Sequence, residues 1–289
     1  RYLKRNEIDL LFCNQTRDVK LGGLAGRLAG TPRIFARLGL DVIKNKADHR
    51  IAYTRFVDGI IANTHALKQK YDAFNWFDQR RIRVVHDGIE IPKQVPGIDL
   101  HERFDLRKGT KTVVAAGRLS PQKGFDLLVE VARMAMDNDK PWRILIAGSG
   151  RSEASLKRLS ASMQVQDYIR FLGFQEDVLP IMKSADVFVL SSRSESMSNV
   201  LREAMAVQTA CVATDVTGVD ELIEQEVSGL IVGAITAEAM YDGIDRVLSD
   251  DDFRLKLAHN GFDCVSGHFT LQHMVQQAEK IFEDSLRGR

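Results

Sequence analysis

Short apolar runs alternate with helical patterns over residues 8–86. The apolar runs are rich in β-branched and aromatic residues and end at polar residues, as strands do. The segments between them repeat apolar residues at helical spacing. This alternation predicts a parallel sheet with crossover helices. The expected strands span residues 8–13, 33–36, 59–63 and 82–86, and the expected helices span residues 21–28, 44–56 and 66–71.

A second series of the same kind follows and predicts a doubly wound unit of its own. Its strands are expected at residues 112–116, 143–147, 169–172, 187–190 and 210–214, with a helical stretch in each gap. Proline and glycine accumulate over residues 87–97, where the periodicity stops, so we place a domain linker there. The last segment, residues 270–282, is a helix with one apolar face. The expected parts are a first domain at residues 1–92, a second domain at 93–268 and a C-terminal helix at 269–289.

The composition is typical of a soluble globular chain. Its 289 residues, 44% hydrophobic and 27% charged, suffice for two domains of ordinary size. No stretch approaches the roughly 18 uninterrupted apolar residues of a membrane span, and the N-terminus lacks the apolar core of a signal peptide. Three scattered cysteines are too few for a disulfide framework, so we expect a cytoplasmic protein. Because the chain begins at Arg1 inside a helical pattern, we expect it to be N-terminally truncated.

The net charge of +1 hides an asymmetry between the two parts of the chain. Residues 1–92 hold 17 Lys and Arg against 10 Asp and Glu, whereas residues 93–289 hold 23 against 29. A basic domain attracts polyanions, and an anionic membrane surface attracts basic residues by about 1 kcal/mol each. The asymmetry therefore indicates either a membrane surface or phosphorylated acceptor as partner, or basic residues that merely solvate an exposed face.

Candidate chemistry begins where the expected strand at 112–116 ends. Gly117 is followed by Arg118, by Lys123 and then by a helix start. Glycine permits close approach of the backbone to a ligand, while Arg118 offers a planar fork for phosphate oxygens and Lys123 a point charge. Charge-assisted hydrogen bonds of about 1.5–3 kcal/mol exceed the roughly 0.3–1 kcal/mol of a helix dipole. These two side chains should dominate anion binding, although Arg118 taken alone is also consistent with a surface ion pair.

Two glutamates border the junction after the expected strand at 187–190. Glu195 lies on the expected loop and Glu203 inside the expected helix. Ligands of open α/β sheets bind at such strand-to-helix junctions. Ser198 or Asn199 is expected to cap this helix, whose first free N–H groups point at an anion. Glu203 can accept two hydrogen bonds from a vicinal diol such as a ribose, and Glu195 can contact a sugar hydroxyl. A lone helical glutamate is otherwise simply solvated.

Two further strand ends carry glycine turns. Gly148 and Gly150 let the backbone approach a ligand, although such turns end many strands. The chain lacks the full Gly-x-Gly-x-x-Gly spacing of a dinucleotide site. Phe174 stands in the turn at residues 173–177, which either reads a planar base or is a plain loop. The histidines lack metal-ligand spacing, and the three aspartates at 250–252 are expected to cap a helix.

A set of motifs carries a resemblance to a known family. The motifs are Gly117-Arg118-Leu119 with Lys123-Gly124, Glu195 with Glu203, Glu203-Ala204-Met205-Ala206, Thr214-Asp215-Val216-Thr217-Gly218, Glu221-Leu222-Ile223 and Ser228-Gly229-Leu230-Ile231-Val232. In order and spacing they resemble the retaining glycosyltransferases of family 4, over residues 82–289. The resemblance implies the α/β GT-B fold, with two Rossmann-like doubly wound domains that face a cleft, the N-terminal one incomplete here. It also implies a nucleotide-sugar donor, transfer with retention at the anomeric carbon, and no essential metal.

The resemblance implies a role for each candidate residue. Arg118 and Lys123 match the diphosphate-binding pair, which stabilises the charge that develops on the leaving diphosphate. Glu203 matches the ribose-binding glutamate, and Glu195 matches the first glutamate of the motif, near the donor sugar. The other expected donor-binding residues are Gly117, Phe174, Ser198, Asn199, Val200 and Leu201, the last three through backbone amides at the distal phosphate.

Two positions depart from the family pattern. Leu38-Gly39, beside Arg37, stands where members often have His-Gly, so the role of that histidine is unassigned. Ser196-Met197 replaces the Gly-Phe that commonly follows the first glutamate, which leaves the contacts to the donor sugar open.

The sequence predicts a glycosyltransferase that transfers a sugar from a nucleotide-diphosphate sugar. The expected donor is a UDP-sugar. The expected acceptor is a glycan or glycolipid, such as a lipid-linked, surface-polysaccharide or lipopolysaccharide precursor, at the inner face of the plasma membrane. Neither a cofactor nor a nucleic-acid partner is expected. Two alternatives remain: a nucleotide-sugar epimerase of the same fold, and a donor-binding module without turnover. The sequence does not name the sugar, the acceptor or the oligomeric state.

Overall fold

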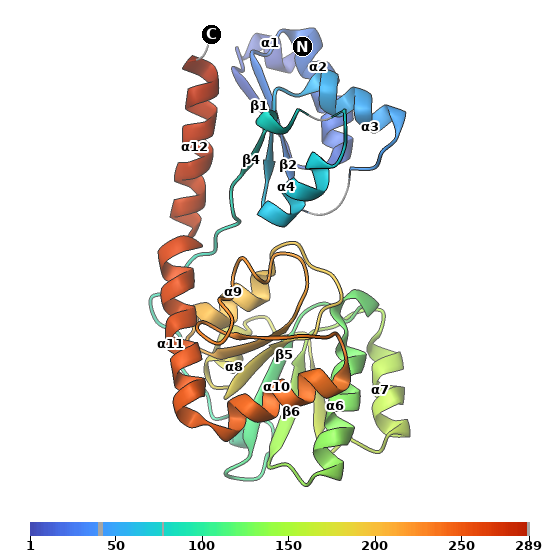
Figure 1. The fold of residues 1–289 in the computed structure, drawn as a ribbon, viewed down its shortest axis with the longest axis vertical. Helices are drawn as coiled ribbons and strands as arrows, with labels where there is room; N and C mark the ends of the chain where they lie inside the picture. The colour runs from blue at the N-terminus through green and yellow to red at the C-terminus, as the bar shows by residue number, and fades with distance from the viewer. Residues whose placement is uncertain (40–42, 77, 288–289) are drawn as a thin grey trace. The chain divides into compact units, whose positions relative to one another are not determined.

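The computed structural model describes residues 1–39, 43–76 and 78–287. The chain forms two compact units (Figure 1). Unit 1 comprises Arg1–Gly88 and Leu271–Arg289, and unit 2 comprises Ile89–Thr270.

The chain passes from unit 1 to unit 2 after residue 88 and returns to unit 1 after residue 270. Both boundaries lie within a few residues of those that the sequence suggested, residues 92 and 268. Ile89 and Ile91 pack against the core of unit 2. Proline and glycine mark where regular structure stops, but the packing of neighbouring apolar side chains decides to which unit a residue belongs.

Unit 1 is built around a four-stranded parallel sheet. Its strands lie side by side in chain order, β1-β2-β3-β4. The strands are β1 (Leu10–Cys13), β2 (Arg33–Leu38), β3 (Gly59–Ala62) and β4 (Ile82–Val84). The helices of its N-terminal segment are α1 (Tyr2–Arg5), α2 (Thr16–Ala29), α3 (Ala47–Ile51), the π-helix η1 (Ala52–Phe56), α4 (His65–Asp72) and the 3₁₀ turn η2 (Gln79–Arg81). The helix expected at 44–56 thus forms as an α-helical turn followed by a π-helical one.

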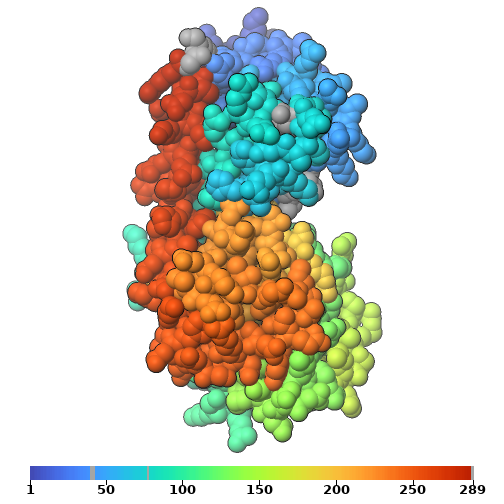
Figure 2. Space-filling model, in the orientation of Figure 1, coloured from blue at the N-terminus to red at the C-terminus, as the bar shows by residue number. Residues whose placement is uncertain are grey.

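The two faces of this sheet are covered by segments from opposite ends of the chain. In β2, Ile34 and Ala36 join the core beneath α2, η1 and α4, whereas Phe35 points to the other face. That other face is covered by the C-terminal helix α12 (Leu271–Arg287), drawn in red beside the blue and cyan surface of unit 1 in Figure 2. Phe282 of α12 meets the ring of Phe35 edge-on at 5.1 Å between centroids, and the ring of Phe12 at 5.3 Å.

Unit 2 contains a six-stranded parallel sheet in the order β10-β9-β8-β5-β6-β7. Its strands are β5 (Lys111–Ala116), β6 (Trp142–Ala147), β7 (Ile169–Gly173), β8 (Val187–Leu190), β9 (Ala210–Thr214) and β10 (Leu230–Val232). Its helices are α5 (Leu100–Arg103), the 3₁₀ turn η3 (Pro121–Lys123), α6 (Phe125–Asp137), α7 (Glu153–Ser162), α8 (Leu179–Lys183), α9 (Asn199–Ala206), α10 (Ala237–Ser249) and α11 (Asp251–His268).

The strand order of unit 2 reverses between β5 and β8. From β5 the chain builds the sheet outward through β6 and β7, then returns to place β8 on the other side of β5. Within β5, Val113 and Ala115 face the core formed with α6 and α10, while Val114 and Ala116 face the core formed with α8 and α9. This is the doubly wound arrangement that the sequence predicted for this part of the chain. It opens a crevice where the chain leaves β5 and β8 in opposite directions.

The structure also bears on two smaller predictions, a helix cap and the absence of a membrane span. The Asp250 side chain accepts a hydrogen bond of 2.9 Å from the backbone N–H of Phe253, so the aspartate run caps α11 as expected. Among the helices that the structure describes, none is long and apolar enough to cross a membrane.

Candidate functional site

The candidate site lies where β5 and β8 end side by side. The loop after β5 and the loop after β8 are joined by several hydrogen bonds. Ser191 Oγ donates to the carbonyl oxygen of Lys123 at 2.9 Å, and the backbone N–H of Arg193 donates to that of Gln122 at 2.8 Å. The Gln122 side chain in turn donates to the carbonyl oxygen of Ser194 at 2.8 Å. The two loops therefore position one another.

Glycine makes this close approach of backbones feasible. Gly124 has φ 64°, and a Cβ on it would lie 2.0 Å from the carbonyl oxygen of Ser191. Gly148, in the loop after β6, has φ 142°, and a Cβ there would lie 1.9 Å from the carbonyl oxygen of Gly117. Both positions combine a backbone conformation that favours glycine with a contact that excludes any side chain. Gly148, which was predicted to admit a ligand, thus also packs the site's own loops together.

Lys123 and Glu195 are bound to one another. Lys123 Nζ lies 2.5 Å from Glu195 Oε1, and the side chains are only 20% and 10% exposed. Ser192 Oγ donates to the same carboxylate oxygen at 2.6 Å. The sequence assigned Lys123 to a phosphate and left Glu195 free to contact a sugar. The expectation that Glu195 is unpaired is wrong, because the strand order places the two loops next to each other and Glu195 binds Lys123.

Arg118 is exposed at the edge of a pocket. Within the part of the chain that the structure describes, its guanidinium makes neither a hydrogen bond nor an ion pair, unlike that of Arg193 in the neighbouring loop, which holds Asp126 at 2.6 and 2.7 Å. Arg118 therefore has all its donors available for an anion. The surface ion pair considered for Arg118 does not form here.

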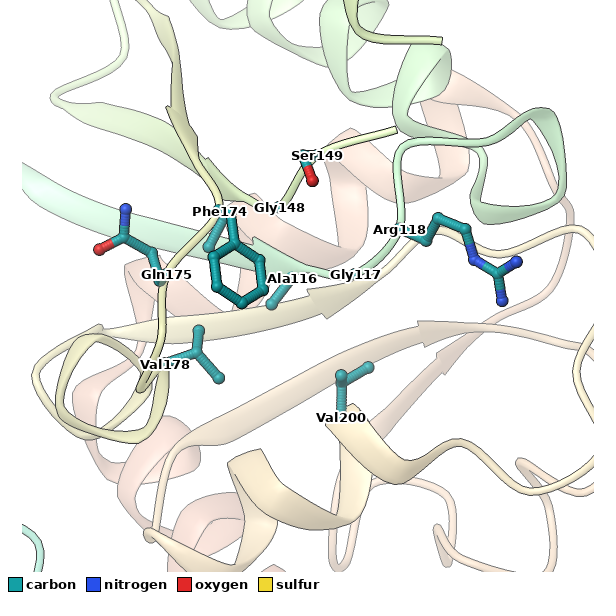
Figure 3. Close-up of a pocket in the computed structure, with 10 residues that line it drawn as sticks. Ala116, Gly117, Arg118, Gly148, Ser149, Phe174, Gln175, Val178 and Val200 are labelled. Carbon is teal, nitrogen blue, oxygen red and sulfur yellow. The ribbon is translucent and has the colours of Figure 1, made fainter. Parts of the chain in front are cut away.

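The pocket has a volume of about 370 Å³ and follows the carboxyl ends of β5, β6 and β7. Figure 3 shows Phe174 and Arg118 toward opposite ends of it, with Gly117 between them. Its lining residues are Ala116, Gly117, Arg118, Ala147, Gly148, Ser149, Phe174, Gln175, Val178 and Val200.

The Phe174 end of the pocket is mainly apolar. The Phe174 side chain is 75% exposed, and Ala116, Val178 and Val200 form walls near it. An exposed aromatic ring beside apolar walls suits the face of a planar ring system, which stacks on aromatic side chains. Together with Arg118 at the other end, the pocket can hold a molecule with one flat and one anionic part.

The N-terminus of α9 adjoins this pocket through Val200. Ser198 occupies the N-cap position, as expected, but its hydroxyl accepts no hydrogen bond from the helix. Instead the Ser198 hydroxyl is buried and has no hydrogen-bond partner among the described residues. The first N–H groups of α9 therefore receive no side-chain cap, and they carry the partial positive charge of the helix end. Such an end is suited to an anion.

Glu203 stands one turn further along α9, on the same side as Val200. Its carboxylate is half-buried and makes neither a hydrogen bond nor an ion pair within the described part of the chain. Burial raises the pKa of Glu203, and the neighbouring charge of Arg202 opposes this shift only in part. Hydroxyl donors of a ligand would satisfy this carboxylate.

Arg202 is a residue of this region that the sequence analysis missed. It is 0% exposed, in a helix whose other buried residues are Leu201, Ala204, Met205 and Ala206. A charged residue on the apolar side of a predicted amphipathic helix is a signal that a helical wheel would have shown.

The carboxyl end of the sheet in unit 1 also carries a polar cluster. Arg37 forms an ion pair with Asp87, and Asn63 Nδ2 donates to the same carboxylate at 2.9 Å. These residues lie near Leu38-Gly39, where the family often has a histidine. Leu38 itself is buried in the core.

The fold and the site define an α/β protein with Rossmann-like parallel sheets and a pocket at the switch point of the second sheet. Residues 98–263 match the family described as Glycosyl transferases group 1, and the chain belongs to that family.

Two relatives and a solved structure illustrate the similarity. The lipopolysaccharide core biosynthesis glycosyltransferase LpsE of Rhizobium meliloti is 30% identical over 223 residues, which are 76% of this chain and 63% of LpsE. The chain thus spans less than two thirds of the length of LpsE. The UDP-Gal:alpha-D-GlcNAc-diphosphoundecaprenol alpha-1,3-galactosyltransferase of Escherichia coli is 23% identical over 309 residues, 98% of this chain and 77% of that protein.

The structure of Anabaena HepE in complex with UDP aligns with a TM-score of 0.87 at 20% identity, over 98% of this chain and 81% of HepE. At this identity the likeness concerns the fold. It confirms the α/β GT-B class, with two Rossmann-like parallel-sheet domains, that the sequence predicted.

Proposed function

We propose that this protein is a retaining glycosyltransferase whose donor, a UDP-sugar, binds in the pocket at the switch point of unit 2. Phe174 and the apolar walls take the base, and Glu203 takes the ribose hydroxyls. The diphosphate lies between Arg118, Lys123 and the N-terminus of α9, and the donor sugar lies near Glu195. Gly117 and the backbone of Asn199, Val200 and Leu201 approach the phosphates.

One observation carries the proposal. A pocket at the carboxyl ends of neighbouring strands is lined by an unpaired cation, Arg118, and by Val200 in the first turn of α9, whose N-terminus has no side-chain cap. The same helix carries an unpaired half-buried carboxylate, Glu203, one turn further along. The cation and the helix N-terminus attract a diphosphate, and the carboxylate accepts hydrogen bonds from a diol. Family membership and the relatives named above support the same chemistry.

The proposed reaction breaks the bond between the anomeric carbon and the diphosphate oxygen, and the electron pair stays on that oxygen. The acceptor hydroxyl oxygen bonds to the same face of the anomeric carbon, and its proton passes to the leaving diphosphate. Arg118 and the end of α9 stabilise the charge that develops on the diphosphate. Lys123 adds its charge when it exchanges Glu195 for a phosphate oxygen. The proposal uses no metal and no cofactor.

The acceptor that we propose is a lipid-linked or lipopolysaccharide precursor, met at the cytoplasmic face of the membrane. Unit 1 supports contact with an anionic surface, because α2 exposes Leu21 and Leu28, and α1 exposes Tyr2, in a basic part of the chain. Flotation with phosphatidylcholine vesicles, with and without phosphatidylglycerol, tests this contact. The Leu21→Ser/Leu28→Ser variant should lose binding to the anionic vesicles, and equal binding by both proteins would contradict the proposed surface.

The donor site is tested by thermal shift with UDP-, GDP- and ADP-sugars, since a ligand that binds the native state raises its melting temperature. We expect stabilisation by a UDP-sugar. In calorimetry, Arg118→Ala and Lys123→Ala should each weaken UDP binding at least about tenfold, or about 1.4 kcal/mol. Arg158→Ala, which removes an exposed cation from α7, is the matched control. Absence of stabilisation by all three donors would contradict the proposal.

Retention is tested on the product. Transfer to a defined acceptor, followed by NMR of the anomeric proton, should show the same configuration as in the donor. An inverted product would leave the donor site in place but overturn the retaining mechanism.

A further inference from the structure

Arg202 is fully buried and lies on the core side of α9. Withdrawing a guanidinium from water carries a large desolvation cost, and an apolar residue of similar volume often serves a protein's stability as well or better. Neighbours on this side of the helix, such as Met205 and Ala206, are indeed apolar. An arginine here therefore calls for a reason beyond the packing of the core.

The guanidinium of Arg202 turns back toward the start of its own helix. Its Nη2 donates to Asn199 Oδ1 at 2.5 Å, and its Nε lies 3.4 Å from the carbonyl oxygen of Ser198. These two acceptors belong to the N-cap residue and the first residue of α9, next to the uncapped N–H groups. The buried cation thus holds the helix end that faces the pocket.

The contact fixes which way the Asn199 carboxamide faces. Oxygen and nitrogen leave the same carbon in different directions, so the amide nitrogen points away from Arg202 when the oxygen faces it. Asn199 is exposed, and its Nδ2 makes no hydrogen bond among residues 1–39, 43–76 and 78–287. Two N–H donors are therefore presented at a positive helix end.

We infer that Arg202 is a positioning residue, which orients Asn199 so that its side-chain amide donates to the distal phosphate of the donor. This inference rests on the proposed function, and it adds a side-chain contact to a helix end that otherwise binds through backbone groups. Arg202 acts from beneath the site and does not touch the donor.

The choice of ligand isolates the distal phosphate. UDP carries it and UMP does not, so calorimetry with both ligands separates this contact from those of the base and the ribose. Asn199→Ala and Asn199→Asp alter an exposed side chain, and both should fold. We expect Asn199→Ala to bind UDP about tenfold more weakly, as for loss of one charge-assisted hydrogen bond, and UMP almost unchanged. Asn199→Asp should be weaker still for UDP, because it replaces the donor with a negative charge.

Arg202→Met tests the positioning role, with thermal unfolding as the check that the protein is folded. It should weaken UDP binding about tenfold and leave UMP binding within about twofold. If Arg202 acts through Asn199, the double variant Arg202→Met/Asn199→Ala should be no weaker than either single variant. Asn138→Ala is the control, because Asn138 is an exposed asparagine at the C-terminal end of α6 in unit 2.

The outcomes separate this inference from the proposed function. Wild-type protein that binds neither UDP nor UMP would overturn both. Wild-type binding of UDP with full affinity in Asn199→Ala, or equal losses for UDP and UMP, would overturn the inference alone. Losses that multiply in the double variant would also overturn it, because Arg202 would then act independently of Asn199. If Arg202→Met fails to fold, the two Asn199 variants still decide the contact to the distal phosphate.

Discussion

Lys123 Nζ and Glu195 Oε1 lie 2.5 Å apart, although 72 residues separate them in the sequence. The pair joins the loop after β5 to the loop after β8 across the switch point of unit 2. A ligand phosphate that binds Lys123 has to compete with this carboxylate. We therefore expect Glu195 to limit the positive charge that Lys123 presents to a diphosphate.

Replacement of Glu195 by glutamine should strengthen UDP binding. The variant keeps the shape of the side chain but removes the charge that neutralises Lys123, so we expect an affinity gain of about three- to tenfold, or about 0.7–1.4 kcal/mol. Calorimetry at low and high salt should show a smaller gain at high salt. Glu176→Gln removes the same charge from the exposed loop after β7 and serves as control. Weaker UDP binding in Glu195→Gln would show that Glu195 supports the phosphate site instead of competing with it.

Glu203 should give the protein a stability that depends on pH. Burial raises the pKa of Glu203 above its usual value of 4.5. Between the usual and the raised pKa, the folded protein holds this proton more tightly than the unfolded chain, so the free energy of unfolding falls as the pH rises through that range. Glu203→Gln removes this loss. We expect its melting temperature to exceed that of wild type by a few degrees near neutral pH, and the difference to shrink in acid.

Glu203→Gln should weaken UDP binding, although it should stabilise the fold. An ionised Glu203 accepts hydrogen bonds from ribose hydroxyls, so UDP affinity of wild type should rise as the pH passes the pKa of this carboxyl. Glu203→Gln should bind UDP at least about tenfold more weakly near neutral pH and lack that rise. Glu130→Gln, in the exposed side of α6, controls for loss of a helical glutamate. A variant with unchanged UDP affinity would remove Glu203 from the site.

Gly124→Ala should disrupt the joined loops. The Cβ would meet the carbonyl oxygen of Ser191 at 2.0 Å in addition to the left-handed backbone penalty. Gly109→Ala shares a positive φ of 83° but has open space around the Cβ. We expect Gly109→Ala to cost about 1–2 kcal/mol and Gly124→Ala at least about 1–3 kcal/mol more, both measured by denaturant unfolding. Equal losses would mean that the loops move apart easily.

Phe282→Ala should destabilise unit 1. The ring fills the space between Phe12 and Phe35, so its removal should cost about 2–4 kcal/mol. Val275→Ala on the same helix removes a side chain that is 40% exposed and should change stability by less than about 1 kcal/mol. Denaturant unfolding of both variants measures the difference. A similar small effect of both changes would show that α12 contributes little to unit 1.

Periodicity predicted most strands because both faces of these parallel sheets are buried. The strand expected at 210–214 coincides with β9, in which every residue is buried. The exact helix type of the segment at 44–56 was harder to predict, because a π-helical turn has nearly the same local sequence pattern as an α-helical turn.

The sequence predicted only those parts of the site that depend on residues close together in the chain. Gly117 and Arg118 could be singled out because a glycine and a cation follow a strand directly, and both line the pocket. The pairing of Lys123 with Glu195 depends on which strands become neighbours, and the sequence does not state that β8 returns beside β5. Ser198 or Asn199 was expected to cap α9 from its residue type; Ser198 takes the N-cap position, but its buried hydroxyl makes no bond to the helix.

Unit 1 is completed by the last segment of the chain. Phe12, Phe35, Ile61 and Val85 form the face of the first sheet that α12 covers, and α12 begins only at Leu271. During synthesis on the ribosome, this apolar face therefore stays uncovered while all of unit 2 is being made. Unit 2 is continuous in the chain, so all of its residues are available for folding before α12 has been made. Nascent chains arrested before residue 271 would expose that sheet face to chaperones and to aggregation.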